Sequence, residues 1–324
     1  MHDIGGVIMK KVVGLRKKYK LSGSCVAIST SNKYMVRSTD RKIYLSDFKT
    51  NQIIKTIKSD CVILRNISPN DKYCVGTFNG ELGIKVFNLP ELEEVVSLDV
   101  AEDEYVVFVD FLSDAEFVYC VRVRKEAGKL YTYNIETGKL SVVYTIDYDK
   151  FCLPLQHPFW NDGLLCIPLQ NKKNENALTK FVMWDGKNFQ EKEIPCQEDG
   201  NFYDFSNILN NKILFNKYIE EGNVVLGVYD FDSKEFTPIS SFSRPIETYW
   251  VSDDLFWFSQ VNVGKLGRSG LMNLKGEIQI MHDTFSFANT NCNEDYFIVD
   301  AMSSYVYEKI YEYDDATTKN TSTN

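Results

Sequence analysis

Short apolar segments separated by turn residues recur along the whole chain, and residues 67–98 show the pattern most clearly. An apolar run at 74–78 follows a Ser-Pro-Asn-Asp turn at 68–71, and a second run at 82–87 follows Asn-Gly-Glu at 79–81. Runs of this length, bounded by Pro, Asn, Asp and Gly, are typical of strands joined by tight turns rather than of capped helices. The segment therefore predicts three or four short antiparallel strands in one unit.

An Asp or Asn that ends the third strand of each unit, usually after a large apolar residue, gives the period of the repeat. These residues are Asp47, Asn88, Asn134, Asp185, Asp230, Asn273 and Asp314. Neighbouring members lie 41 to 51 residues apart. A period in this range indicates the blades of a β-propeller, with one group of strands per repeat. The sequence thus predicts an all-β, seven-bladed β-propeller made of four-stranded antiparallel blades.

The last repeat is one strand short, and this deficit predicts how the ring closes. The predicted blades are Cys25–Ile57, Val62–Leu98, Val106–Ile146, Leu155–Ile194, Tyr203–Phe242, Glu247–Met281 and Phe285–Asp314. Only three strands fit into the last of them, whereas the strand predicted at 12–21 has no sheet of its own. A missing outer strand would leave an unpaired edge, so we expect the N-terminal strand to pair with the last blade. Repeats of this kind close into one unit. We therefore predict a single domain over 1–324, with 1–6 and 316–324 disordered.

The first two units resemble WD40 repeats in their turn and strand residues. The resemblance lies in Val-Ala-Ile-Ser at 26–29, in Ile-Tyr-Leu-Ser-Asp at 43–47 and in the turn at 68–71; Trp184–Asp185 is the single literal Trp-Asp pair. The chain lacks the Gly-His pair that begins a typical repeat, and its histidines are at 2, 157 and 282. The hydrogen-bond network that the family builds on that histidine is therefore not expected in its standard form. The resemblance implies a divergent WD40-like propeller that serves as a binding platform.

Composition narrows the partners and the compartment. The formal net charge of −9 argues against a nucleic acid or an anionic membrane, because phosphate binding relies on basic patches. The eight cysteines are at 25, 61, 74, 120, 152, 166, 196 and 292, and none forms a Cys-x-x-Cys pair. They favour free thiols in a cytoplasmic protein over a disulfide framework or a metal site. No apolar run reaches the roughly 18 residues of a membrane helix, and no signal peptide is expected.

No catalytic motif stands out in the sequence, and we predict no cofactor and no metal. The segment Gly264–Gly270 does not have the spacing of a phosphate-binding loop and is predicted to be a hairpin loop. One enzymatic alternative stays open, a metal-dependent hydrolase or lactonase with its site at the mouth of the central channel. Its candidate residues on the innermost strands are Asp110, Asp204, Glu247 and Asn289. The other interpretation of these four is ordinary channel lining that binds water.

The non-enzymatic interpretation places a binding surface on one rim of the ring. In a WD40-like blade, the connection between the second and third strands and the connection to the next blade lie on one face. This resemblance assigns six residues to that face: Arg37, Arg122, Arg124, Tyr203, Tyr249 and Arg268. Arg and Tyr are enriched at binding hot spots. We therefore predict a monomeric scaffold that binds a protein or peptide there.

The N-terminal strand also carries a cluster of cations, Arg16, Lys17, Lys18 and Lys20. One hypothesis is a patch for an acidic partner. The other is a solvated outer edge strand, since lysines protect exposed sheet edges from pairing.

Overall fold

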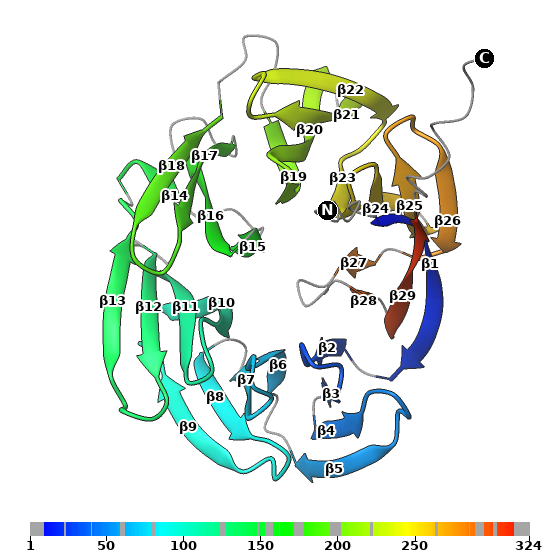
Figure 1. Ribbon diagram of the computed structural model, residues 1–324. Coiled ribbons are helices and arrows are strands. Elements are labelled where there is room, and N and C mark those ends of the chain that lie inside the picture. Colours follow the sequence, from blue (N-terminus) through cyan, green and yellow to red (C-terminus); the bar gives the residue numbers. More distant parts are fainter. Residues whose placement is uncertain are drawn as a thin grey trace, which may run out of the picture.

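A computed structural model describes residues 10–22, 24–39, 41–58, 62–78, 82–123, 128–147, 149–152, 158–161, 163–171, 178–194, 202–220, 223–262, 265–284, 286–288, 295–300 and 303–313. Seven antiparallel sheets stand around a central axis as the blades of a propeller (Figure 1). This confirms the predicted fold class. The segments 1–6 and 316–324, which the sequence predicts to be disordered, lie outside the described residues.

Blades 1 to 3 each run from an innermost to an outermost strand in chain order. Blade 1 contains β2 (Ser24–Ile28), β3 (Tyr34–Thr39), β4 (Lys42–Asp47) and β5 (Ile53–Lys58). Blade 2 contains β6 (Ile63–Ile67), β7 (Tyr73–Phe78), β8 (Gly83–Asn88) and β9 (Glu94–Asp99). Blade 3 contains β10 (Glu104–Phe111), β11 (Glu116–Val123), β12 (Lys129–Asn134) and β13 (Leu140–Thr145).

Blades 4 to 6 continue the same order. Blade 4 contains β14 (Phe151–Cys152), β15 (Phe159–Asn161), β16 (Leu164–Asn171), β17 (Leu178–Trp184) and β18 (Phe189–Glu193). Blade 5 contains β19 (Phe202–Leu209), β20 (Lys212–Glu220), β21 (Asn223–Asp230) and β22 (Glu235–Phe242). Blade 6 contains β23 (Ile246–Ser252), β24 (Leu255–Asn262), β25 (Lys265–Asn273) and β26 (Ile278–His282). In blade 4 two short segments, β14 and β15, both pair with β16 where one inner strand was expected.

Blade 7 combines the two ends of the chain, as the strand deficit predicted. It contains β27 (Phe287–Ala288), β28 (Tyr296–Asp300) and β29 (Ser304–Tyr313), and its outermost strand is β1 (Lys10–Leu21). β1 pairs with β29 from Lys10 opposite Tyr313 to Leu21 opposite Ser304. The closing strand begins two residues earlier than the predicted start, Val12, because Lys10 and Lys11 continue the ladder.

Each pair of neighbouring blades shares its own apolar core, which explains why the sheets form a closed ring. Blades 1 and 2, for example, bury Val36 and Leu45 against Leu64 and Phe87. The junction of blades 7 and 1 is packed in the same way, with Leu21 and Val306 against Val26. Burial of one large apolar side chain stabilises a fold by about 1.5–3 kcal/mol. The ring is therefore held at its closure by the same force that holds the other junctions.

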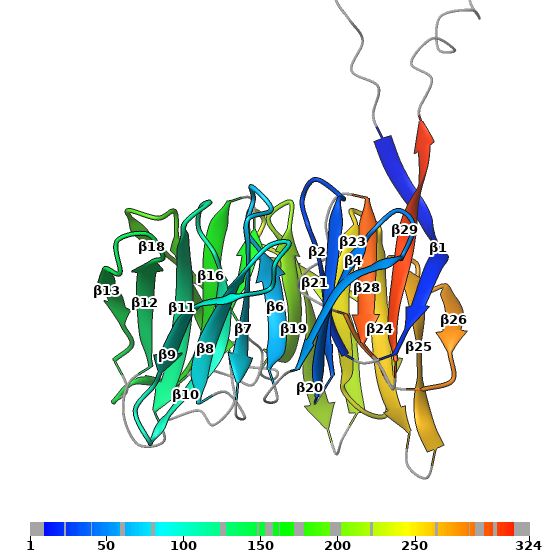
Figure 2. The same cartoon turned by 90° about the horizontal axis from the view of Figure 1, so that it is seen from below.

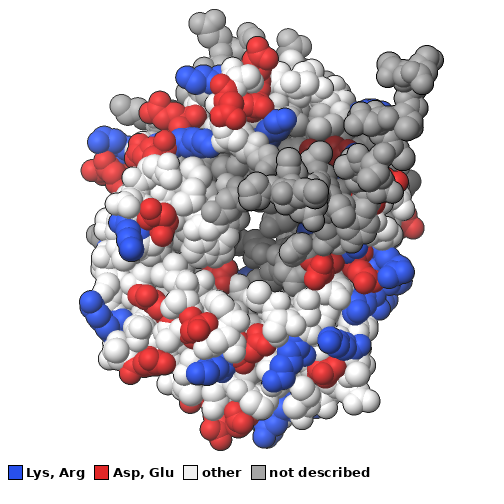
Figure 3. All heavy atoms as spheres, in the orientation of Figure 1, with Lys and Arg blue, Asp and Glu red and all other residues white. Residues whose placement is uncertain are grey.

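The strands of a blade alternate in direction, so the ring has two distinct faces. We call the face that carries the second-to-third connections and the connections between blades the rim face. The opposite face, where β1 begins and β29 ends, is the terminus face. In Figure 2 the start of β1 and the end of β29 project beyond the ring at the top, so the rim face lies at the bottom. Figures 1 and 3 look onto the terminus face.

One predicted loop is a strand in the structure. The segment Gly264–Gly270 was predicted to be a hairpin loop because of its glycines, but β25 begins at Lys265 and pairs with β24 through that segment. Glycine was a misleading turn signal here: the backbone of β26 passes so close that a Cβ atom on Gly270 would lie 2.0 Å from the carbonyl oxygen of Gln279. The glycine is required for close packing of two strands.

Candidate functional site

The structure describes the side chains of four of the six predicted binding residues. Arg37 and Arg122 lie near the ends of the second strands β3 and β11, and Arg268 lies near the start of β25. Tyr249 lies in the innermost strand β23. Tyr203 belongs to β19, but its side chain is outside the described part of the structure, and Arg124 lies outside it altogether. The residues come from blades 1, 3 and 6, so they do not form one cluster.

Arg37 is fixed by contacts within the protein. Its Nη1 donates hydrogen bonds to the carbonyl oxygen of Ser22 at 2.9 Å and to the Ser22 hydroxyl at 3.0 Å. The guanidinium carbon lies 4.6 Å from the centre of the Tyr44 ring, within the range of a cation–π interaction. These contacts tether the end of the closing strand to blade 1. Arg37 is therefore a positioned part of the rim rather than a mobile surface arginine.

Arg268 and Tyr249 also make contacts within the protein, whereas Arg122 is exposed. The Nε of Arg268 donates a hydrogen bond to the Oε1 of Gln260 at 3.1 Å. The Tyr249 ring packs against the core between blades 6 and 7, with its centre 5.9 Å from that of Phe297. Arg122, by contrast, has an exposed side chain at the end of β11. Among the four located residues it is the one most available to a partner.

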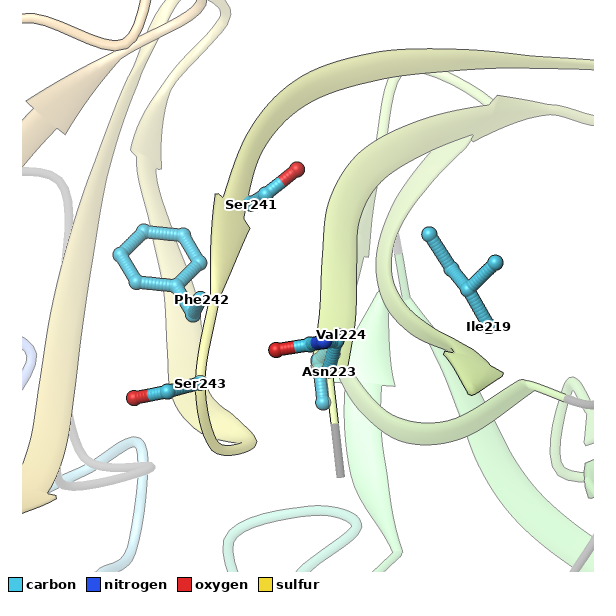
Figure 4. Close-up of a pocket in the computed structure, with 6 residues that line it drawn as sticks. All are labelled: Ile219, Asn223, Val224, Ser241, Phe242 and Ser243. Atoms are coloured by element: carbon cyan, nitrogen blue, oxygen red, sulfur yellow. The ribbon is translucent and has the colours of Figure 1, made fainter. Parts of the chain in front are cut away.

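A groove on blade 5 opens on the rim face, and no sequence motif pointed to it. It has a volume of about 430 Å³ and lies where the strands β20, β21 and β22 reach the rim. Its lining residues are Ile219, Asn223, Val224, Ser241, Phe242 and Ser243. Figure 4 shows the last three along the end of β22, Asn223 and Val224 at the start of β21, and Ile219 beyond them. The groove thus combines apolar side chains with serine hydroxyl groups.

The surroundings of the groove are suited to a peptide. Ile219 is 54% exposed, whereas Phe242 is buried. Arg244 follows the lining residue Ser243 directly and is exposed. A groove lined by apolar and polar residues, next to an exposed arginine in the sequence, fits a segment that carries an apolar side chain beside a carboxylate. No sequence pattern indicates this groove, because the exposure of an isoleucine in a strand depends on its neighbours in space.

The innermost strands of three successive blades are linked by a half-buried carboxylate, Asp110. Its carboxylate accepts hydrogen bonds from Asn66 Nδ2 of blade 2, from Trp160 Nε1 of blade 4 at 2.9 Å, and from the backbone N–H of Phe111 at 2.7 Å. Burial raises the pKa of Asp110 to about 6, although these three donors favour the charged form and lower it. Both carboxylate oxygens are engaged by side chains of the neighbouring blades. Asp110 is therefore a link between blades 2, 3 and 4.

The enzymatic alternative stays a prediction that no described contact favours. Glu247, another candidate of this alternative, lies on β23 and is exposed. The side chain of Asp204 and the whole of Asn289 lie outside the described part of the structure. Within the described residues, no group of three or more His, Cys, Asp or Glu side chains could hold a metal ion. The histidine at 157 is likewise outside the described residues.

Two of the cysteines can be assessed directly. Cys74 and Cys120 are free and buried, and burial raises the pKa of each thiol to about 12. Such thiols are unreactive, since the thiolate is the nucleophilic form. That the remaining cysteines are free stays a prediction. In the described part of the chain there is no helix that is long and apolar enough to span a membrane.

The chain matches no sequence family and no curated protein, but solved structures share its fold. The β-propeller domain of Cps50 (Swd1) from Myceliophteria thermophila is 8% identical, with a TM-score of 0.54 over 93% of this chain and 100% of that one. The WD40 domain of SCAP from fission yeast is 10% identical, with a TM-score of 0.51 over 94% of this chain and 89% of that one. The chain therefore shares the β-propeller fold of these structures.

The fold by itself does not decide between binding and catalysis. An oligogalacturonate lyase in complex with manganese is also similar, with 10% identity and a TM-score of 0.58 over 94% of this chain and 98% of that chain. At such identities the similarity concerns the backbone alone, and one propeller fold hosts unrelated functions. Function must therefore be argued from the sites of this chain.

Proposed function

We propose that this WD40-like propeller is a non-enzymatic scaffold, monomeric and cytoplasmic, that binds a segment of a partner protein on its rim face. The observation that carries the proposal is the groove on blade 5 with the exposed Ile219 beside it. A groove of about 430 Å³ accommodates one or two side chains of a bound segment. The WD40 domains among the similar structures are consistent with a binding role.

The chemistry around the groove suggests what the partner segment contains. Ile219 favours an apolar side chain, because contact with a partner removes its exposed apolar surface from water. Arg244 favours an Asp or Glu next to that side chain, since a guanidinium pairs well with a carboxylate. We therefore propose an extended segment with an apolar residue next to an acidic one.

Arg122 extends the proposed surface to a second blade. It is exposed on the rim face at the end of β11, two blades from the groove. A partner that contacts both the groove and Arg122 binds with higher overall affinity, because the second binding event becomes intramolecular. Arg122 thus serves as a secondary contact in this proposal.

A nucleic acid is a poor candidate for the partner. The formal net charge of −9 opposes the approach of a polyanion, and phosphate contacts supply most of the non-specific affinity for nucleic acids. On the terminus face, acidic and basic side chains are interspersed (Figure 3). The exception is the edge of the ring covered by β1, at the right of Figure 3, where blue side chains gather.

A random-peptide display library tests the proposal, with the purified full-length protein as bait. Selected peptides are measured by fluorescence anisotropy against the variants Ile219→Asp and Arg244→Glu. We expect each variant to weaken binding by about tenfold or more, as for a hot-spot residue. The selected peptides should share an apolar residue next to an acidic one.

The chain offers a closely matched control for this experiment. Ile53 is 54% exposed, as Ile219 is, but it begins the outermost strand β5 beside a connection of the terminus face. Ile53→Asp should leave the affinity unchanged. If Ile53→Asp and Ile219→Asp weaken binding equally, or if no peptide is selected over a blank surface, the rim groove is not the binding site.

A further inference from the structure

The closing strand β1 contains an irregularity at Lys18 that redirects its side chain. Lys17 lies opposite Tyr307 and Tyr19 lies opposite Val306, so Lys18 is an extra residue in the ladder. In a regular strand, Lys18 and Tyr19 would point to opposite faces of the sheet. A β-bulge of this kind changes the direction of side chains. The Lys18 ammonium consequently lies 5.5 Å from the ring centre of its own neighbour, Tyr19.

Three aromatic rings surround the ammonium group of Lys18. Its Nζ is 5.4 Å from the ring centre of Phe48 and 5.3 Å from that of Tyr296, in addition to the contact with Tyr19. All three distances fall within the roughly 6 Å over which a cation is attracted to a ring face. The rings come from three strands or turns: Tyr19 from β1, Tyr296 from β28, and Phe48 from the turn after β4. They therefore join blade 7 to blade 1.

The rings are held in place independently of Lys18. The Phe48 ring meets Tyr19 edge to face at an interplanar angle of 83° and Tyr296 at 82°. The Tyr19 hydroxyl donates hydrogen bonds to the carbonyl oxygens of Phe48 at 2.8 Å and Lys49 at 2.9 Å. Phe48 is buried. The rings of Tyr19, Phe48 and Tyr296 are therefore held by contacts with one another and with the backbone.

Glu308 attracts Lys18 electrostatically, but aromatic rings are the groups that surround its ammonium. Among the described residues, no Asp or Glu forms an ion pair with Lys18; the nearby Glu308 pairs with Arg16 at 2.6 Å instead. Lys20 of the same strand lies over one ring, that of Tyr305 at 5.7 Å, whereas Lys18 is held among three.

We propose that Tyr19, Phe48 and Tyr296 form an aromatic cage for an alkylammonium group, and that Lys18 of the same chain occupies it. The cage binds through cation–π attraction and through contact with methylene or methyl groups, so it accepts a methylated ammonium as well as a primary one. While Lys18 occupies the cage, the closing strand is fastened to blade 1. When Lys18 is absent, the same cage becomes a site for an external quaternary ammonium group.

Choline and its uncharged isostere, in which a tert-butyl group replaces the trimethylammonium group, test this directly. The isostere has the same shape without the charge, so a cation–π site distinguishes the two. In the full-length Lys18→Ala variant, choline should bind in the millimolar range, and the isostere should bind about tenfold more weakly. The wild-type protein should bind neither, because its cage is occupied. A Lys17→Ala variant, changed at the neighbouring residue of β1, should behave as the wild type does.

The double variant Lys18→Ala, Tyr296→Leu locates the site. Loss of one ring should abolish the preference for choline over the isostere. Equal affinity of Lys18→Ala for the two ligands, or no detectable choline binding by this folded variant, would overturn the proposal.

A second measurement needs no variant that weakens the fold. In the wild-type protein, the ε-methylene protons of Lys18 lie near three rings, whose ring currents should shift their NMR signals upfield of those of the other lysines. Addition of choline should leave these signals in place. A Lys18 signal at the position of an exposed lysine would show that the cage is not occupied, and would contradict the proposal even if the Lys18→Ala variant failed to fold.

Discussion

The residues that set the repeat period are turn residues, and their side chains explain the period. Asp47, Asn134 and Asp230 each accept hydrogen bonds from backbone N–H groups two or three residues later. The same arrangement occurs at Asp185 and Asn273, whereas Asn88 accepts a hydrogen bond from the N–H of Glu93, five residues later. Asp and Asn favour such turns because their short side chains mimic a backbone carbonyl. In blades 1 to 6 the recurring residue thus begins the connection between the third and fourth strands.

Replacement of Asn134 measures what one of these turns contributes. Its Oδ1 accepts hydrogen bonds from the N–H of Glu136 at 3.1 Å, from the N–H of Thr137 at 2.9 Å and from the Thr137 hydroxyl at 3.0 Å. Asn134→Ala should lower the free energy of unfolding by about 1–2 kcal/mol in urea denaturation. Asn134→Asp keeps the acceptor and should lie close to the wild type. An equal loss in both variants would show that the turn does not depend on this acceptor.

Asp110 predicts a specific pH dependence of stability. Burial raises its pKa in the folded protein to about 6 from an ordinary value of 3.8. The folded state therefore binds the proton more tightly than the unfolded state does. The stability that this protonation contributes is fully present below pH of about 4 and is lost as the pH rises through about 6.

The variant Asp110→Asn cannot titrate and isolates this contribution. Relative to the wild type, its free energy of unfolding should increase between pH of about 4 and about 7, by up to about 3 kcal/mol. Urea denaturation at several pH values measures the difference. The expected effect is a change in the slope of the free energy of unfolding against pH. The absolute free energy of unfolding also changes, because Asp110→Asn loses the charged hydrogen bonds to Asn66 and Trp160. Parallel pH profiles would contradict the prediction.

At the scale of a strand, close backbone contact decides which residues are allowed. A Cβ atom on Gly270 in β25 would lie 2.0 Å from the carbonyl oxygen of Gln279 and 2.9 Å from the backbone nitrogen of Met281. Both atoms belong to the neighbouring strand β26, which cannot move as a flexible side chain can. On Gly14 in β1, by contrast, a Cβ atom would meet only the end of the Ile310 side chain at 3.8 Å.

The two glycines give a matched pair of alanine substitutions. Gly270→Ala should destabilise the protein by about 1–3 kcal/mol or more, because β26 must shift to make room. Gly14→Ala should change the free energy of unfolding by less than about 1 kcal/mol, and in either direction. Thermal unfolding followed by circular dichroism measures both. If Gly270→Ala unfolds at the wild-type temperature, β26 does not approach β25 as closely as described.

The strands could be predicted from the sequence, because the turn residues that bound them are local. The sites could not, because their residues lie far apart in the sequence. The Asp and Asn turns are local, so the blades and the order of strands were predicted correctly. The link from Asp110 reaches Asn66 and Trp160, which lie 44 and 50 residues away in the sequence. The cage around Lys18 depends on a bulge, which only the pairing with β29 reveals. Tyr249 is a case where residue type was misleading. It was predicted to be a binding residue because tyrosine is common at interfaces, but its side chain packs against the core.

At the scale of the whole molecule, β1 determines whether the ring is closed. It supplies a full ladder to β29, and it buries Val12 and Leu15 at the junction with blade 6 and Leu21 at the junction with blade 1. Its cation Lys18 lies among the aromatic rings of Tyr19, Phe48 and Tyr296 at that second junction. Two junctions of the ring therefore depend on a strand that comes from the opposite end of the sequence.

A chain that begins at Ser22 should consequently be insoluble or unfold far below the temperature of the full chain. Backbone hydrogen bonds contribute about 1 kcal/mol each, and each large apolar side chain contributes about 1.5–3 kcal/mol when buried. Loss of several of each approaches the whole 5–15 kcal/mol by which a domain is usually stable. A chain that begins at Met9 retains all of β1 and should unfold as the full chain does, and removal of residues 316–324 should also have little effect. Differential scanning calorimetry compares the four proteins. A soluble Ser22 chain that unfolds cooperatively at an unchanged temperature would show that β1 does not hold the ring closed.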